Sequence, residues 1–230
     1  PTVAFTNTYK AAEVSVDGAN VAGTKTLDGR DGKEGETFGF TLEYVSGPQG
    51  GCRLTGDAQA TVGELVKDTA KGFDFDGTQL IFSKPGTYAF KVTETSWNGE
   101  AIPTEATQGM TFDTHEGTVT VTVADDGTGK LKASTSLAGM DFVNTYRPAD
   151  ATFNVSDANK FYKQLDGRDW LDSDSFTFEM SAEAGTPMPD GAEGNVARVE
   201  LTSPNSAEGT TVEFGFGNIT YTQGDLAGAL

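Results

Sequence analysis

Three polar residues lie on strand faces that the sequence pattern otherwise fills with apolar side chains. Segment 88–94 alternates apolar with small or polar residues, and Glu94 falls in phase with the apolar ones. Asn144 likewise falls in phase with the apolar positions of segment 140–146. Lys25 lies two residues from Leu27 and therefore shares its side of a strand. We therefore expect a lysine, a glutamate and an asparagine to face one core.

These three residue types can react with one another when they are buried. Burial lowers the pKa of a lysine and raises the pKa of a glutamate, so both lose their charge. A neutral amine is a nucleophile, and a protonated carboxyl can hydrogen-bond and polarise a carboxamide carbonyl. Attack of Lys25 on the carboxamide of Asn144, assisted by Glu94, would release ammonia and leave an amide between two strands. The alternative is a surface ion pair of Lys25 and Glu94 beside a capping Asn144.

The remaining candidate residues are interpreted as structural. His115 is expected in a solvated loop, Cys52 as a lone, partly exposed thiol in a loop, and Trp97 and Trp170 as local packing at turns. Three carboxylate pairs that could bind calcium do not fit the twelve-residue calcium loop and are interpreted as solvated turns: Asp74 and Asp76, Asp125 and Asp126, and Asp172 and Asp174. We expect no metal site and no cofactor.

The elements that must hold the three residues are short strands. Alternation predicts strands at 38–44, 87–95 and 118–123, and segment 125–130 predicts a hairpin turn. The best helical candidate, 58–71, is weakened by its Thr, Val and Gly residues. Many short strands separated by turns predict an all-β fold, a β-sandwich.

The sequence also repeats itself over about one domain length. The motif at 5–9 recurs at 142–146, the motif at 25–31 recurs at 163–169, and that at 37–40 recurs at 175–178, all 137 to 138 residues later. We therefore expect the last strand of a preceding repeat at 1–10, a complete domain at 11–147 and the truncated start of a following repeat at 148–230. A chain that starts at Pro1 rather than Met is also expected to be part of a longer protein.

Composition excludes several classes of function. The 230 residues carry a net charge of −18, whereas nucleic acids and anionic membranes require a basic surface. One Cys and one His leave no internal disulfide framework and little scope for a Cys- or His-based metal site. The apolar runs are too short for a membrane-spanning helix, so we expect no membrane insertion.

The motifs resemble the isopeptide linkage domains of Gram-positive pilins and surface adhesins. They are Lys-x-Leu at 25–27, Phe-x-Phe-x-Leu at 38–42, the Lys-Pro-Gly segment 84–94, and Phe-x-Asn-Thr-Tyr at 142–146. The resemblance implies immunoglobulin-like β-sandwich repeats of the pilus-shaft type in tandem. It also implies a bond from a lysine of the first strand to an asparagine of the last, assisted by an acid. Matched by motif, these are Lys25, Asn144 and Glu94.

Asn7 and Lys163 match the same motifs, but their partner residues lie outside the sequence, so we expect neither to be linked within the chain. The resemblance implies a structural module of an extracellular, cell wall-anchored protein. This module would pack against neighbouring repeats and would not act as an enzyme beyond one self-crosslinking turnover. The alternative function is an adhesin domain that recognises host glycan or matrix protein through loops 45–57 and 96–109.

Overall fold

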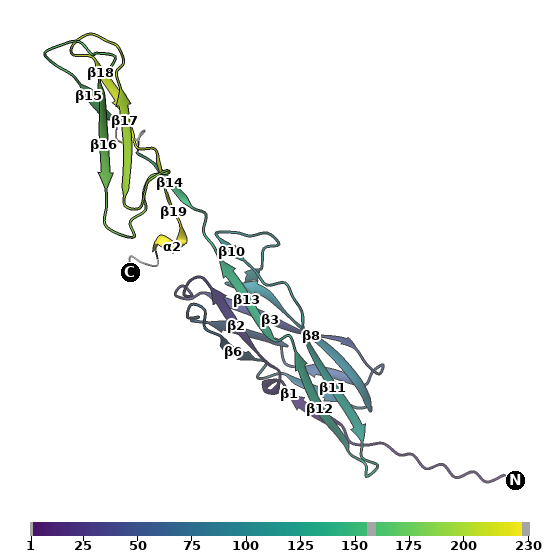
Figure 1. The fold of residues 1–230 in the computed structure, drawn as a ribbon. Helices are drawn as coiled ribbons and strands as arrows, with labels where there is room; N and C mark the ends of the chain where they lie inside the picture. Colours follow the sequence, from purple (N-terminus) through teal and green to yellow (C-terminus); the bar gives the residue numbers. More distant parts are fainter. Residues whose placement is uncertain (1, 156–159, 227–230) are drawn as a thin grey trace. The chain divides into compact units, whose positions relative to one another are not determined.

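The computed structural model describes residues 2–155 and 160–226, which are almost entirely strands and turns. The chain divides into two compact units, Pro1–Arg147 and Pro148–Leu230, and each is described by itself. The expected all-β fold class is confirmed (Figure 1).

The described part of the first unit forms three sheets. One small sheet has the order β1 (Val14–Asp17), β7 (Gln79–Phe82) and β4 (Cys52–Thr55). The other has the order β10 (Met110–Thr111), β13 (Asp141–Tyr146), β2 (Ala22–Asp28) and β6 (Lys71–Asp74). The large sheet has the order β12 (Leu131–Ala138), β11 (Gly117–Asp125), β8 (Gly86–Trp97), β3 (Thr37–Ser46) and β5 (Gln59–Gly63), with β9 (Glu100–Ala101) beside β8. A short 3-10 turn, η1 (Gly18–Asn20), joins β1 to β2.

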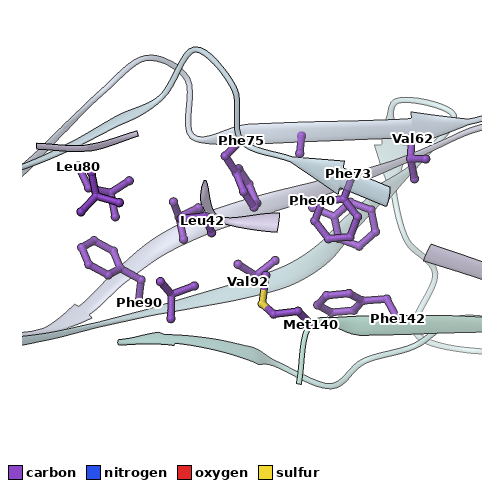
Figure 2. Packing of buried hydrophobic residues seen from close by; sticks show 14 of the residues in the cluster. Phe40, Leu42, Val62, Phe73, Phe75, Leu80, Phe90, Val92, Met140 and Phe142 are labelled. Carbon is purple, nitrogen blue, oxygen red and sulfur yellow. The ribbon is translucent and has the colours of Figure 1, made fainter. Parts of the chain in front are cut away.

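Aromatic side chains pack the large sheet against the two smaller ones. Phe40 of β3 stacks on Phe73 of β6, with 3.9 Å between the ring centroids. Phe90 of β8 meets Phe82 of β7 edge to face at 6.3 Å. Because the large sheet contacts both smaller sheets through buried rings, the unit is a two-layer sandwich with one continuous core (Figure 2).

One parallel pair in this sandwich positions the candidate site. β13 runs parallel to β2, and Phe142 lies opposite Lys25 while Asn144 lies opposite Leu27. Residues two apart on a strand share a face, so Lys25 and Asn144 are diagonal neighbours on the inner side of this sheet. β8 is a central strand of the large sheet, where Glu94 lies opposite Phe40. The glutamate therefore reaches the pair from the opposite layer.

The second unit contains three two-stranded ladders among its described residues. They pair β14 (Ala151–Asn154) with β19 (Asn218–Tyr221), β15 (Phe161–Gln164) with β18 (Thr211–Phe214), and β16 (Ser175–Ser181) with β17 (Val196–Thr202). A single helical turn, α2 (Gln223–Leu226), follows β19. Trp170 is buried and packs edge to face on Phe176.

The strand predictions are confirmed, and the weak helical candidate at 58–71 forms no helix. The predicted strands correspond to β3, β8 and β11, and 125–130 is the turn between the antiparallel strands β11 and β12. Segment 58–71 is not a helix: it contains β5, whose Ala60 and Val62 are buried while its Thr61 is exposed. That two-residue period places Ala60 and Val62 on the same, core-facing side, whereas residues two apart lie on different faces of a helix.

Removing a ring from the centre of the core should destabilise the first unit. Phe40 is 1% exposed and contacts the rings of Phe73 and Phe142. We expect Phe40→Ala to lower the free energy of unfolding by about 3–5 kcal/mol, because it leaves a cavity. Urea denaturation followed by circular dichroism measures this. Phe5→Ala is the control, since Phe5 is 92% exposed, and equal losses in both variants would contradict the packing described.

Candidate functional site

Lys25, Glu94 and Asn144 lie together in the core of the first unit. Lys25 and Asn144 have no exposed surface, and Glu94 is 4% exposed. Lys25 comes from β2, the second strand of the chain, Asn144 from β13 and Glu94 from β8. The inward orientation predicted for the three residues is confirmed, and the alternative of a surface ion pair is wrong.

One carboxylate bridges the other two side chains. Lys25 Nζ donates to Glu94 Oε2 at 2.7 Å, and Asn144 Nδ2 donates to Glu94 Oε1, also at 2.7 Å. Since both nitrogens are bound to the two oxygens of a single carboxylate, the amine and the carboxamide are held next to each other.

The orientation of the Asn144 carboxamide differs from the one expected. The backbone N–H of Asp113 donates to Asn144 Oδ1 at 2.8 Å. A backbone N–H can only donate, so the oxygen must face Asp113 and the amide nitrogen must face Glu94. The predicted hydrogen bond from Glu94 to the carbonyl is therefore wrong: Glu94 contacts the nitrogen that would leave as ammonia.

The surroundings of the pair favour its uncharged form. Burial lowers the pKa of Lys25, although the nearby Glu94 opposes this effect. Burial likewise raises the pKa of Glu94 against the opposing effect of Lys25. Lys25 Nζ also lies 5.1 Å from the centroid of the buried Phe38 ring. The site therefore excludes water and moves both groups towards neutral amine and neutral acid.

Asp113 and His115 form a residue pair next to this site that the sequence pattern did not predict. His115 was predicted in a solvated loop, but its ring stacks on Phe142 at 4.5 Å between centroids. Its Nδ1 lies 2.6 Å from Asp113 Oδ1, and its Nε2 lies 2.9 Å from the carbonyl oxygen of Gly139. The Asp-x-His spacing of Asp113 and His115 was only a weak signal for this contact in the sequence. Strand alternation could not reveal it, because both residues lie in a loop.

Both ring nitrogens of His115 face acceptors. A carboxylate and a backbone carbonyl cannot donate, so satisfying both contacts requires an imidazolium with two N–H groups. Partial burial alone would lower the pKa of His115, but the hydrogen bonds to Asp113 and to the Gly139 carbonyl, together with the negative charges of Asp113 and Asp141, outweigh it and raise the pKa. Burial would raise the pKa of Asp113, but hydrogen bonds from Val143, from the His115 backbone and from its ring hold it low.

The two residues that match the motif outside the complete domain lie apart from any such cluster. Asn7 is exposed, and residues 2–10 form no strand within the described part of the chain. Tyr9 of that segment donates to Asp125 Oδ1 and accepts from the backbone N–H of Gly129. Lys163 is half-buried in β15, with Nζ 4.5 Å from the centroid of the Phe176 ring.

Each of two segments predicted as loops contains a short strand. Segment 45–57 contains β4, which pairs with β7, and segment 96–109 contains β9, which pairs with β8. Cys52 is therefore in a strand and not in a loop, and burial raises the pKa of its thiol to about 11.

Two further kinds of site were sought in the described residues. Among them, no three His, Cys, Asp or Glu side chains come close enough together to hold a metal ion. The same residues contain no helix with the length and apolar character needed to cross a bilayer.

The two packed layers, and the parallel strand pair that carries the buried lysine and asparagine, define a β-sandwich structural domain. Residues 21–147 match the family model FctA, described as the Spy0128-like isopeptide containing domain. The chain belongs to this family. It is therefore a structural pilin-type module and not an enzyme.

Solved structures and curated proteins were also compared. The chain is similar to the major pilin from Streptococcus pyogenes, with 20% identity, a TM-score of 0.43, and coverage of 92% of this chain and 78% of that one. It is also similar to a single-residue mutant of that pilin, with 18% identity, a TM-score of 0.45 and the same coverage. No curated protein sequence matches the chain.

The contact between Asp113 and His115 predicts a pH-dependent contribution to stability. A raised His115 pKa stabilises the fold below about pH 6.5, and this contribution is lost as the pH rises through the folded-state pKa. A lowered Asp113 pKa stabilises above about pH 3.9 and is lost as the pH falls through its folded-state pKa. The combined contribution is therefore greatest in mildly acidic solution.

The chain has one histidine, so an NMR titration reports on His115 directly. We expect its pKa to lie above 6.5 and to fall in Asp113→Ala. Asp141 has only a minor effect on this pKa, so Asp141→Ala is the control and should change it less. An unchanged pKa in Asp113→Ala would show that the contact does not form.

Proposed function

We propose that the first unit links Lys25 to Asn144 through an intramolecular isopeptide bond that it forms without any other protein. The observation that carries this proposal is the single buried carboxylate that binds both Lys25 Nζ and Asn144 Nδ2. The family to which the chain belongs is described as isopeptide-containing, which supports the same chemistry.

The reaction begins with a proton transfer within the buried pair. Lys25 passes a proton from Nζ to Glu94 Oε2, along a hydrogen bond of 2.7 Å. Burial favours this transfer because it replaces two charges with two neutral groups in a site that excludes water. The product is a neutral amine beside the carboxamide.

The amine then attacks Cγ of Asn144. A bond forms between Nζ and Cγ, and the carbonyl electrons move onto Oδ1. Glu94 gives its proton to Nδ2, with which it is already in contact, and accepts one from Nζ. The bond between Cγ and Nδ2 breaks and ammonia leaves. Glu94 ends protonated, as its raised pKa favours.

The bond would protect the domain against unfolding under load. It ties β2 to β13 and closes a loop of about 120 residues, which the loop-entropy model values at about 4–5 kcal/mol. Because β2 and β13 lie near opposite ends of the domain sequence, pulling on the termini would not separate them. The link would also survive reduction, unlike a disulfide.

We further propose that the second unit is part of another copy of this domain. Its ladders follow the strand pairing of the first unit: β15, which contains the counterpart of Lys25, pairs with β18 as β2 pairs with β6, and β16, which contains the counterpart of 37–40, pairs with β17 as β3 pairs with β5. The chain would then join neighbouring modules of an extracellular stalk on a cell wall. Residues 1–10 would be the closing strand of a preceding module, and Asn7 and Lys163 would stay unlinked within this chain.

The adhesin alternative receives no support from the segments assigned to it. Segments 45–57 and 96–109 were the candidate regions for glycan or matrix protein, and both contribute strands to the sandwich.

The bond predicts a defined loss of mass. We expect the intact protein to weigh one ammonia less than its sequence, and Lys25→Ala, Glu94→Gln and Asn144→Ala each to have the full sequence mass. Mass spectrometry of the denatured protein measures this directly. Lys91→Ala and Glu43→Ala are matched controls, since these residues form a surface ion pair, and both variants should keep the mass deficit. A full sequence mass for the unaltered chain would refute the bond.

The bond also predicts a stability difference. We expect Lys25→Met, which removes the nucleophile but keeps an apolar stem, to lower the free energy of unfolding by about 4–5 kcal/mol. Urea denaturation measures this difference, and limited proteolysis should show faster cleavage of the variant. A Lys25→Met variant as stable as the unaltered protein would mean that the bond contributes nothing to stability.

A further inference from the structure

We propose that the backbone N–H of Asp113 is the oxyanion donor of this ligation and that the contact between Asp113 and His115 holds it in place. This inference rests on the isopeptide bond proposed above. It assigns a catalytic role to a backbone group in the loop between β10 and β11, and positioning roles to the side chains of Asp113 and His115.

The donor is already directed at the atom on which negative charge would develop. Asp113 N lies 2.8 Å from Asn144 Oδ1, within the range that oxyanion donors require. When Nζ attacks Cγ, the carbonyl electrons move onto this oxygen, so the hydrogen bond strengthens in the transition state. Asn144 is fully buried, so water cannot replace the donor.

Glu94 is not available for this role. Its Oε1 accepts from Asn144 Nδ2 and its Oε2 accepts from Lys25 Nζ, so its two oxygens serve the leaving group and the nucleophile. The carboxamide oxygen faces away from Glu94 and towards Asp113. Proton transfer and charge stabilisation are therefore divided between two residues on opposite sides of the carboxamide.

The side chain of Asp113 fixes its own backbone against β13. Asp113 Oδ2 accepts from the backbone N–H of Val143 at 2.8 Å, and Val143 directly precedes Asn144. Asp113 Oδ1 accepts from the backbone N–H of His115 at 3.0 Å. The donor and the carboxamide are thus tied to each other through two consecutive residues of one strand.

His115 attaches the same loop to the chain at two further points. Its Nδ1 lies 2.6 Å from Asp113 Oδ1, and its Nε2 lies 2.9 Å from the carbonyl oxygen of Gly139, just before β13. Its ring stacks on Phe142 of the same strand. The loop is therefore attached at several points to the stretch of chain that leads directly into the reacting asparagine, which keeps the N–H aligned without any movement during the reaction.

A single-atom change tests the donor itself. Replacing the peptide bond between Phe112 and Asp113 by an ester, with the α-hydroxy acid analogue of Asp113 in cell-free synthesis, removes the N–H and keeps every side chain. Intact mass of samples quenched over time gives the rate of ammonia loss. We expect the ester variant to ligate about 100-fold more slowly than the unaltered chain.

Side-chain variants test the clamp. We expect Asp113→Ala to slow ligation and Asp113→Asn to restore part of the rate, because the single amide oxygen of Asn can still accept from the backbone N–H of Val143 or of His115, but not from both. Asp141→Ala is the matched control. Asp141 of β13 accepts from Thr24 Oγ1 of β2 at 2.7 Å, so it joins the two strands that carry Asn144 and Lys25 without itself contacting Asn144. A merely structural role for Asp113 would affect stability in both alanine variants and the ligation rate in neither. Circular dichroism establishes which variants are folded.

The outcomes separate this inference from the proposed function. If the unaltered chain loses ammonia and the ester variant ligates equally fast, the assignment of the oxyanion donor is wrong, but the proposal of the isopeptide bond still holds. An unaltered chain that never loses ammonia would overturn both. If the ester variant does not fold, equal ligation rates in folded Asp113→Ala, Asp113→Asn and Asp141→Ala would overturn the role of Asp113.

Discussion

A lysine ammonium and a glutamate carboxylate enclosed in one apolar core are the constraint on which the rest of this structure depends. Separating either from water is costly, and the ion pair recovers the cost only with good geometry and satisfied hydrogen bonds. Glu94 supplies that geometry, because its two oxygens take Lys25 and Asn144 at once. Covalent ligation would remove the cost altogether, since a neutral amide and a neutral acid replace the charged pair.

The sandwich is arranged so that these three groups can meet only after folding. Lys25 and Asn144 come from parallel neighbours in one layer, and Glu94 comes from a central strand of the other layer. In the unfolded chain they are separated by 50 to 119 residues and are fully hydrated. The packing of rings such as Phe40 on Phe73 brings the layers together and expels water from the site. The reactive state of the lysine is thus a consequence of core formation.

Strand alternation was enough to select Lys25, Glu94 and Asn144, because a two-residue period states which side chains face inward. The same logic identified β3, β8 and β11. It did not identify β5 within 58–71, which was only a weak helical candidate, or β4, where Cys52 was expected in a loop. Short strands of four or five residues give too few alternations to outweigh neighbouring turn residues.

The sequence by itself determined the two-residue pattern of the strands, the internal repeat and the identity of the three buried polar groups. Only the tertiary structure decided that β2 and β13 are parallel neighbours and that Asn144 presents its nitrogen to Glu94 and its oxygen to Asp113. It also turned His115 from an expected solvated residue into a clamp on β13. The physical reason is that alternation reports the face of a residue, whereas hydrogen-bond partners depend on strand order and on loops that have no period.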